Sequence, residues 1–305
     1  MDIWDIDFPN LGIYLKHVPK SFTVFGFEIA LYGVIIACAI MAGLLMAAHV
    51  AKKHPQAGQD PDMYWDAIVW LVLFGVAGAR IYYVIFMWDN YKDNLLQIFN
   101  LRAGGLAIYG GVIGAVTTIF VYCRIKKKDP YVFLDASSCG LILGQAIGRW
   151  GNFFNREVFG EYTDNLFAMR LPTAMVRNQD ISARIMEKMP EGVNYIQVHP
   201  TFFYESVWNL FVLTLMLLYY KHRKFNGEGI LLYFAGYGIG RACIEYIRTD
   251  QLYLRGTKIP VSMCLGILMA AASVIIDIIV RTGMKNGKFE KLKIREAESK
   301  TDSVS

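Results

Sequence analysis

Long apolar runs separated by short polar segments dominate the chain. Seven of these runs approach the roughly 20 residues that a helix needs to cross the hydrocarbon core of a bilayer. They cover residues 27–50, 66–88, 104–123, 131–148, 202–220, 229–247 and 259–280. The pattern therefore predicts an all-α integral membrane protein with seven transmembrane helices.

Lysines and arginines occur after alternate runs. They follow the first, third, fifth and seventh runs, for example at Lys52, Lys126, Lys221 and Lys285. Because cytoplasmic loops are enriched in these residues, we expect these segments to be cytoplasmic. The N-terminus then lies outside and the C-terminus in the cytoplasm, and residues 149–200 contain a small extracytoplasmic head inserted between helices four and five.

The composition changes near residue 285. Residues 1–284 hold all seven runs and the 149–200 head, so we expect them to form one membrane domain. Residues 285–305 are rich in lysine, glutamate and serine. This composition predicts a basic, disordered cytoplasmic tail.

Overall composition supports the membrane assignment and narrows the function. Of the 305 residues, 55% are hydrophobic and 19% are charged, which is too apolar for a soluble domain of this size. The formal net charge of +5 reflects the basic cytoplasmic loops and is no evidence for nucleic acid as a partner. The five cysteines form no C-x-x-C pair and the acidic residues show no metal-ligand spacing. We therefore expect neither a metal nor another cofactor.

Polar residues crowd the end of the fourth run. Arg149, Asn152, Asn155 and Glu157 follow one another closely before Gly160. Ionisable groups are expensive near hydrocarbon. A cluster of them at the rim of a span is therefore a candidate site for a polar or charged ligand.

A second polar group lies at the end of the sixth run. Tyr237, Arg241, Glu245 and Arg248 are spaced by four, four and three residues, so they share one face of a helix. One interpretation is an internal Arg241–Glu245 pair with Arg248 at the outer interface. The other is a ligand site that offers two cations.

The number of arginines on the outer side favours an anionic ligand. Arg149 and Arg156 at the end of the fourth run would join Arg241 and Arg248. Guanidinium groups bind phosphate oxygens through paired hydrogen bonds and stay charged at any relevant pH. Phosphate is the obvious anion of a membrane.

Glycines mark the runs that pack closely. Gly140, Gly144 and Gly148 recur every four residues, which lets another helix backbone approach. The third run contains two glycine pairs that flank an aromatic residue, which indicates either a broken helix lining a cavity or tight helix packing. These pairs are Gly104-Gly105 and Gly110-Gly111.

Two other charged residues stand within the runs. Arg80, near the outer end of the second run, either snorkels to the interface or joins the anion site. Asp135, near the cytoplasmic end of the fourth run, is interpreted as a residue at the membrane edge with no part in catalysis.

Five blocks in register resemble the prolipoprotein diacylglyceryl transferase family. The most specific is Gly148-Arg149-x-Gly151-Asn152-Phe153-x-Asn155-x-Glu157-x-x-Gly160. The others are Tyr32-Gly33, the glycine-rich segment 104–114, His199-Pro200-x-x-x-Tyr204-Glu205, and Tyr237-Gly238-x-x-Arg241-x-x-x-Glu245. They occur in order over about 32–263, which is nearly the whole membrane part.

This resemblance implies a transferase at the outer face of the bacterial plasma membrane. Its reaction would move the diacylglyceryl group of phosphatidylglycerol to the thiol of the lipobox cysteine in a prolipoprotein signal peptide. A thioether forms and glycerol phosphate is released, which is the first step of lipoprotein maturation. Residues 1–284 would then be the catalytic domain, and the reaction would require no metal.

The resemblance also suggests roles for single residues. Arg149 and Arg241 would clamp the phosphate and stabilise the charge that grows as the C–O bond breaks. The amides of Asn152 and Asn155 would bind the head group or hold the arginines. The other expected substrate-binding residues are Glu157, Gly160, Tyr32, Tyr237, Glu245 and Arg248. A structural role near the site is expected for Gly104, Gly105, Gly110, Gly111, His199 and Glu205.

Tyr109 departs from the family pattern. Many relatives have histidine between the two glycine pairs, where a base-like role has been assigned to it. A tyrosine, with a reference pKa near 10, is a poor base at neutral pH. Either Tyr109 positions the substrate by a hydrogen bond, which we favour, or the arginines lower the pKa of the substrate thiol enough to need no base.

The main alternative is a transporter for a small anion. Cations and glycine-interrupted spans can also line a transport pathway. The two halves of the sequence show no inverted repeat and no paired broken segments, which weakens this interpretation.

Overall fold

The computed structural model describes residues 1–56, 59–101, 104–254, 256–257 and 259–294, and in this part the chain is mostly helical. The helices are α1 (Leu31–Lys53), α2 (Asp62–Phe86), α3 (Ile108–Ile125), α4 (Pro130–Asn155), α5 (Ala183–Lys188), α6 (Thr201–Tyr219), α7 (Glu228–Glu245) and α8 (Val261–Lys285). The strands are β1 (Ile6–Phe8), β2 (Ile13–Leu15), β3 (Ser21–Val24), β4 (Phe27–Ala30), β5 (Met169–Pro172) and β6 (Tyr195–Val198).

A helix occupies each of the seven ranges that the apolar runs predicted. Among the described residues, six helices are long and apolar enough to cross a membrane, namely α1, α2, α3, α4, α6 and α8. The remaining helix, α7, is 18 residues long and carries Glu228, Arg241 and Glu245. These charges lower its hydropathy. The described part of the chain therefore has six candidate membrane-spanning helices, which is typical of a multi-pass membrane protein.

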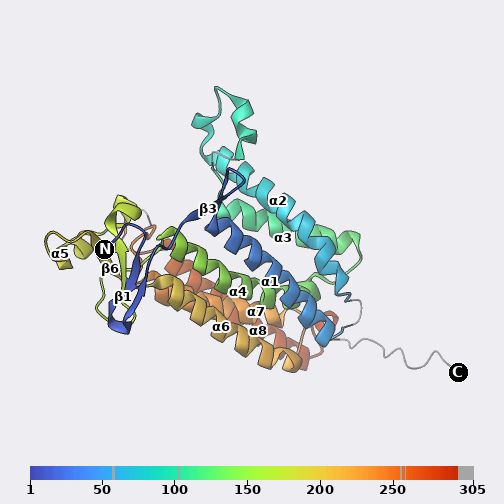
Figure 1. Ribbon diagram of the computed structural model, residues 1–305. Coiled ribbons are helices and arrows are strands. Elements are labelled where there is room, and N and C mark those ends of the chain that lie inside the picture. The colour runs from blue at the N-terminus through green and yellow to red at the C-terminus, as the bar shows by residue number, and fades with distance from the viewer. Residues whose placement is uncertain (57–58, 102–103, 255, 258, 295–305) are drawn as a thin grey trace.

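The long helices pack in three pairs, α1 with α4, α2 with α3, and α7 with α8. Helix α4 also contacts α6 and α7 and is therefore central. The pair α2–α3 lies on one side of α1 and α4, and the helices α6, α7 and α8 lie on the other (Figure 1). The Tyr64 ring of α2 stacks on Phe133 of α4 with 4.8 Å between centroids, and this anchors the start of α2.

The glycine stripe of α4 faces α1. A Cβ atom on Gly43 would lie 2.7 Å from the carbonyl oxygen of Gly140, and one on Gly144 would lie 3.1 Å from that of Ala39. Both distances are too short for a comfortable contact. The predicted close approach of another helix is thus confirmed.

The glycine-rich third segment divides into two parts. Gly104 and Gly105 precede α3 with φ of +79° and +78°, a left-handed backbone that glycine adopts without strain. Inside α3, Gly110 packs against α2, because a Cβ on Gly78 would lie 2.5 Å from the Gly110 carbonyl oxygen. Tight helix packing therefore holds for Gly110, and the helix begins only at Ile108.

The head is a small sheet-containing unit at one end of the bundle. Its antiparallel sheet has the order β2-β1-β5-β6, so the N-terminal strands β1 and β2 complete it (Figure 1). The apolar core includes the fully buried Ile6, Leu171 and Ile196, and it rests on Phe153 and Phe202 at the ends of α4 and α6. The sequence predicted a head formed by residues 149–200 and did not predict that the N-terminal strands belong to it.

The hairpin β3–β4 leads directly into α1. Residues 27–30, which the sequence assigned to the first helix, form strand β4 and pair with β3 in the register Phe22↔Ile29 and Val24↔Phe27. A short apolar segment that continues into a longer apolar run cannot be assigned to a strand or to a helix by periodicity alone. The helix therefore begins four residues later than predicted.

A buried ionic cluster closes the end of the bundle opposite the head. The Asp135 carboxylate, which is fully buried, pairs with Arg223 and accepts backbone N–H bonds from Gly227 and Ile230 at 2.9 and 3.0 Å. Asp135 lies in the second turn of α4, near the helix end where the sequence placed it, but it is buried and not exposed at an edge. It is a core partner of the α6–α7 turn.

The described part of the C-terminal segment contacts this same turn. The backbone N–H of Asn226 donates to the Leu292 carbonyl oxygen at 2.8 Å. Residues 295–305 of the predicted tail lie outside the described residues.

Candidate active site

Three arginines from two parts of the chain meet around one carboxylate. Glu205, in the second turn of α6, forms an ion pair with Arg149 of α4. The Arg149 Nη2 and Glu205 Oε2 atoms are 2.6 Å apart. The other Glu205 oxygen, Oε1, lies 3.9 Å from Arg241 Nη1 and 3.7 Å from Arg248 Nη1. The two polar segments that the sequence singled out are therefore brought together by Glu205.

We define the arginine cluster as Arg149, Arg241 and Arg248. Glu245 is a second carboxylate that contacts it. Its Oε2 lies 2.6 Å from Arg241 Nη2 and 3.8 Å from Arg248 Nε. The internal Arg241–Glu245 pair of the alternative interpretation therefore exists. It is also part of a larger network that crosses to α4 and α6.

Arg248 lies just beyond α7 and is fixed by the loop that follows. It donates two hydrogen bonds to Asp250, at 2.9 and 2.7 Å. Burial by itself would lower the pKa of Arg248, but the hydrogen bond and the charge of Asp250, with Glu205 and Glu245 nearby, raise it. Arg248 therefore stays charged.

The cations of the cluster lie nearer the surface than the carboxylates. The side chains of Arg149 and Arg241 are 19% and 15% exposed, against 5% for Glu205 and 2% for Glu245. Among the described residues, none donates a hydrogen bond to Glu205 Oε1. An incoming anion would therefore meet guanidinium groups of Arg241 and Arg248 that form no hydrogen bond with Glu205 Oε1.

The two predicted amides hold Glu157. Asn152 and Asn155 donate from Nδ2 to Glu157 Oε1 at 3.1 and 3.4 Å. The chain turns back here because Arg156, which ends α4, has a left-handed φ of 56°. Among the described residues, neither Nδ2 donates to an acceptor other than Glu157, and no hydrogen bond joins either side-chain amide to Arg149, Arg241 or Arg248.

Two predicted tyrosines pack beside this region. A Cβ atom on Gly151 would lie 2.8 Å from the ring of Tyr32, so the missing side chain makes room for that ring. Tyr237 stacks on Tyr233 with 5.7 Å between centroids, and the Tyr233 hydroxyl accepts a hydrogen bond from Gln145 of α4 at 2.9 Å.

Gly160 connects the head to the arginine cluster. Its amide donates to the His199 carbonyl oxygen at 3.0 Å, and it pairs with Arg248 in an isolated antiparallel bridge. A Cβ there would lie 2.7 Å from the carbonyl oxygen of Ile247. Burial lowers the pKa of His199, whose Nδ1 lies 3.3 Å from the Tyr204 hydroxyl. Gly160 and His199 therefore link the head to the segment that carries Arg248.

Tyr109 forms no hydrogen bond or ion pair with the described residues of the cluster. It lies in the first turn of α3 and is 47% exposed, and no described residue makes a hydrogen bond with its hydroxyl. Gly104, Gly105, Gly110 and Gly111 belong to the same α2–α3 pair.

Two arginines do not serve the site as the sequence suggested. Arg156 is 2% exposed and donates to the carbonyl oxygens of Phe154, Trp4 and Val18, so it fastens the N-terminal segment. Arg80 neither snorkels nor joins the cluster. It donates to carbonyl oxygens of the segment before α3, at Gln97, Ile98, Asn100, Gly104 and Gly105.

Comparisons with known proteins agree with the motif blocks. The model of the family described as prolipoprotein diacylglyceryl transferase matches residues 19–279. The chain belongs to this family. Similar members include phosphatidylglycerol–prolipoprotein diacylglyceryl transferase 1 of Clostridium perfringens, 38% identical over 88% of this chain and 97% of that protein.

Two further members carry the same enzyme name without the number. That of Finegoldia magna is 38% identical over 85% of this chain and 94% of its own length. That of Acaryochloris marina is 40% identical over 81% and 86%. These names give the transporter alternative no support. Among the residues that the structure describes, no group of three or more His, Cys, Asp and Glu residues is placed to hold a metal ion.

Proposed function

We propose that the chain transfers the diacylglyceryl group of phosphatidylglycerol to the lipobox cysteine of a prolipoprotein. The names of its relatives support this donor and acceptor. The observation that carries the proposal is the convergence of Arg149, Arg241 and Arg248 around Glu205. The Nη1 atoms of Arg241 and Arg248 lie beyond hydrogen-bond distance of Glu205, so they can donate to a further anion, and the phosphate of the lipid head group supplies one.

The reaction is a displacement at carbon. The substrate sulfur attacks the glycerol carbon that bears the phosphate, a C–S bond forms, and the C–O bond breaks with its electron pair on the leaving glycerol phosphate. The thiol proton must depart before or during attack. Negative charge therefore grows on the phosphate, where Arg149 and Arg241 stabilise it.

Glu205 regulates how the arginines meet the phosphate. Arg241 Nη1 and Arg248 Nη1 lie at 3.9 and 3.7 Å from its Oε1, beyond a direct hydrogen bond. These N–H groups can turn to phosphate oxygens while Arg149 stays anchored by its 2.6 Å contact. Glu245 holds Arg241 in the same way.

The remaining predicted residues surround this centre. The amides that hold Glu157 would present it to the hydroxyl groups of the glycerol head group. The rings of Tyr32 and Tyr237 would line the path of the lipid. For Tyr109 we propose a positioning role toward a bound substrate.

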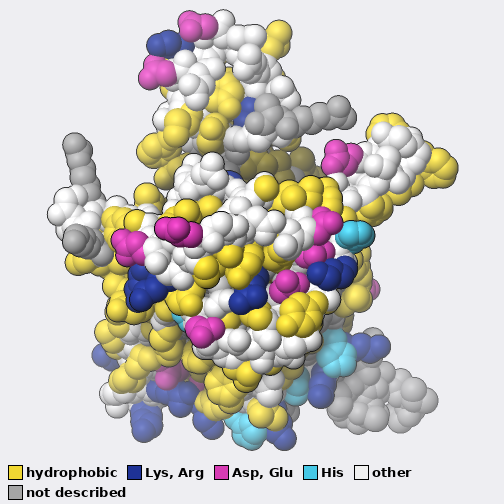
Figure 2. Space-filling model, turned by 60° about the vertical axis from the view of Figure 1, so that its left-hand side comes forward, with side chains coloured by type: hydrophobic (Ala, Val, Ile, Leu, Met, Phe, Trp, Pro, Cys, Tyr) yellow, Lys and Arg dark blue, Asp and Glu magenta, His cyan; other side chains and the backbone are white. Residues whose placement is uncertain are grey.

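The site is proposed to face outward from a bacterial plasma membrane, with α7 as the seventh span. In support, the arginine cluster lies at the head end of the helices, whereas Lys52, Lys53, Lys221 and Lys224 are exposed at the opposite end. Figure 2 shows Lys, Arg and His side chains gathered along the lower end of the molecule. This distribution is typical of a cytoplasmic end.

Mass spectrometry of a synthetic lipobox peptide tests the function. The peptide is incubated with the purified protein and phosphatidylglycerol, and a Cys→Ser peptide serves as the control. A diacylglyceryl mass gain on the cysteine peptide alone is expected. No gain with a monodisperse, membrane-inserted protein would refute the proposal, and anion flux in proteoliposomes would then be measured.

A further inference from the structure

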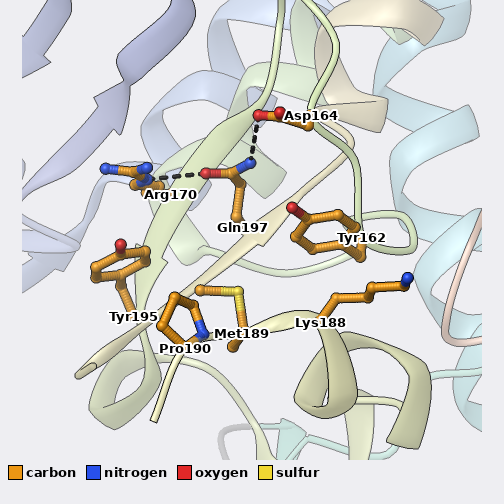
Figure 3. A pocket seen from close by; sticks show the side chains of 8 residues that line it. All are labelled: Tyr162, Asp164, Arg170, Lys188, Met189, Pro190, Tyr195 and Gln197. Carbon is orange, nitrogen blue, oxygen red and sulfur yellow. Dashed lines mark hydrogen bonds between the residues drawn. The ribbon is translucent and has the colours of Figure 1, made fainter. Parts of the chain in front are cut away.

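A polar hollow lies on the head, outside the arginine cluster. Its volume is about 160 Å³. Figure 3 shows Asp164, Gln197 and Arg170 in a hydrogen-bonded row along one side and Tyr195 and Lys188 on the other. Arg170 donates to Gln197 at 2.9 Å and Gln197 to Asp164 at 3.1 Å. These two hydrogen bonds fix the orientation of the side chains along one wall of the hollow.

The hollow faces away from the core of the head. Arg170 and Gln197 are register partners on β5 and β6, whereas their neighbours Leu171 and Ile196 are buried in the apolar core. Successive side chains of a strand point to opposite faces. The polar wall therefore belongs to the face of the sheet that the core does not cover.

The hollow offers hydrogen-bond donors that the fold does not use. Arg170 engages Gln197 through Nε and stacks over Tyr195 at 4.7 Å, and neither Arg170 nor Lys188 forms an ion pair with a described carboxylate. Tyrosine and arginine are the residue types that protein-recognition sites favour. These donors suit the carbonyl groups and polar side chains of an extended peptide.

One short segment joins the hollow to the arginine cluster. Gly160 pairs with Arg248 of the cluster, and Tyr162, two residues on, pairs with Val198 and lines the hollow. The four residue steps from Gly160 to Asp164 span at most about 13 Å, the length of a fully extended chain. A peptide whose cysteine reacts at the cluster would cover this distance with about four residues.

We propose that the hollow binds the polar segment that follows the lipobox cysteine of the acceptor, about four residues beyond it. This inference rests on the proposed function, since it assumes that the acceptor cysteine reacts at the arginine cluster. The hollow then contributes to the affinity for the acceptor and takes no part in the chemistry.

The test compares two acceptor peptides of different length. One ends directly after its cysteine, and the other continues with six polar residues. For the wild-type protein, the KM of the longer peptide should be lower by about three- to tenfold, with the same kcat. Equal KM values would overturn the inference. Transfer to neither peptide would instead refute the proposed function.

Variants of the hollow sharpen this comparison. Tyr195→Ala and Lys188→Ala remove side chains that donate no hydrogen bond within the described structure, so the fold should persist. Each should raise the KM of the longer peptide toward that of the shorter one. The shorter peptide ends before the hollow, so its KM should not move. Arg184→Ala, on the exposed surface of α5, is the control, and an equal change for both peptides would contradict the inference.

Discussion

Glu205 is the one carboxylate that lies within 4 Å of all three described arginines of the cluster. It is 4% exposed, and its two oxygens face Arg149 on one side and Arg241 and Arg248 on the other. Without its charge the arginines would repel one another in a place where water screens them poorly. We therefore propose that Glu205 positions the cations, whereas the sequence suggested only a structural role near the site.

The substitution Glu205→Gln keeps the shape of this side chain and removes its charge. We expect the transfer rate to fall by about 10- to 100-fold, because losing one partner of a buried charge pair costs about 3–5 kcal/mol, shared between folding and function. The transfer rate and Tm of the purified variant measure both parts. Glu187→Gln, exposed on α5, is the matched control, and a Glu205→Gln rate within twofold of wild type would contradict the role.

The sequence did not show that Arg149 and Arg156, at the end of the fourth run, have different partners. Arg149 and Arg156 stand in one polar stretch, and both were expected to favour an anion. The left-handed backbone at Arg156 turns its side chain toward the carbonyl oxygens of Trp4 and Val18. Those partners are about 140 to 150 residues away in sequence, so no local pattern reports them.

At the scale of elements, the α1–α4 contact depends on glycine. A Cβ on Gly43 would lie 2.7 Å from the Gly140 carbonyl oxygen, whereas one on Gly33 of the same helix would meet nothing within 4 Å. The two positions thus form a matched pair on α1. One is needed for close packing and the other is open.

Gly43→Ala should lower Tm by several degrees, because forcing the helices apart costs about 1–3 kcal/mol. Gly33→Ala should leave Tm unchanged or raise it slightly, since alanine is the better helix former by about 1 kcal/mol. Thermal unfolding in one detergent measures both. Equal Tm values for the two variants would argue against the close α1–α4 contact.

The buried Asp135–Arg223 pair fastens the α6–α7 turn to α4. Asp135→Ala leaves Arg223 buried without its partner, which should destabilise the protein by about 3–5 kcal/mol. Asp66, which lies 3.7 Å from Lys126 with both side chains more than half exposed, is the control. Asp66→Ala should cost about 1 kcal/mol or less, and a loss as large as that of Asp135→Ala would show that burial is not the cause.

The helices were predictable because each is long and apolar. The six candidate spans and the helix α7 each overlap one predicted run, although α4 ends seven residues later than its run. The head was not predictable in the same way, since its strands are three or four residues long and β1 pairs with β5 from the far side of four helices in sequence. Strands this short leave no periodic signal.

At the scale of the whole molecule, the orientation in the membrane remains a prediction from the basic residues. It is tested with single cysteines introduced in a cysteine-free variant at Glu187 of the head and at Lys127 after α3, both exposed. A membrane-impermeant maleimide should label the head position in intact cells and the other only after permeabilisation. The reverse pattern would place the head in the cytoplasm.

The central claim is that the arginine cluster stabilises the phosphate as it leaves. Its most direct test is the transfer rate to a lipobox peptide for Arg149→Ala and Arg241→Ala, with Arg177→Ala on the head surface as the control. Removing one such electrostatic group should slow transfer by about 100- to 1,000-fold while the protein stays folded and inserted. The control should keep the wild-type rate. Near-normal turnover in either Arg149→Ala or Arg241→Ala would contradict the claim.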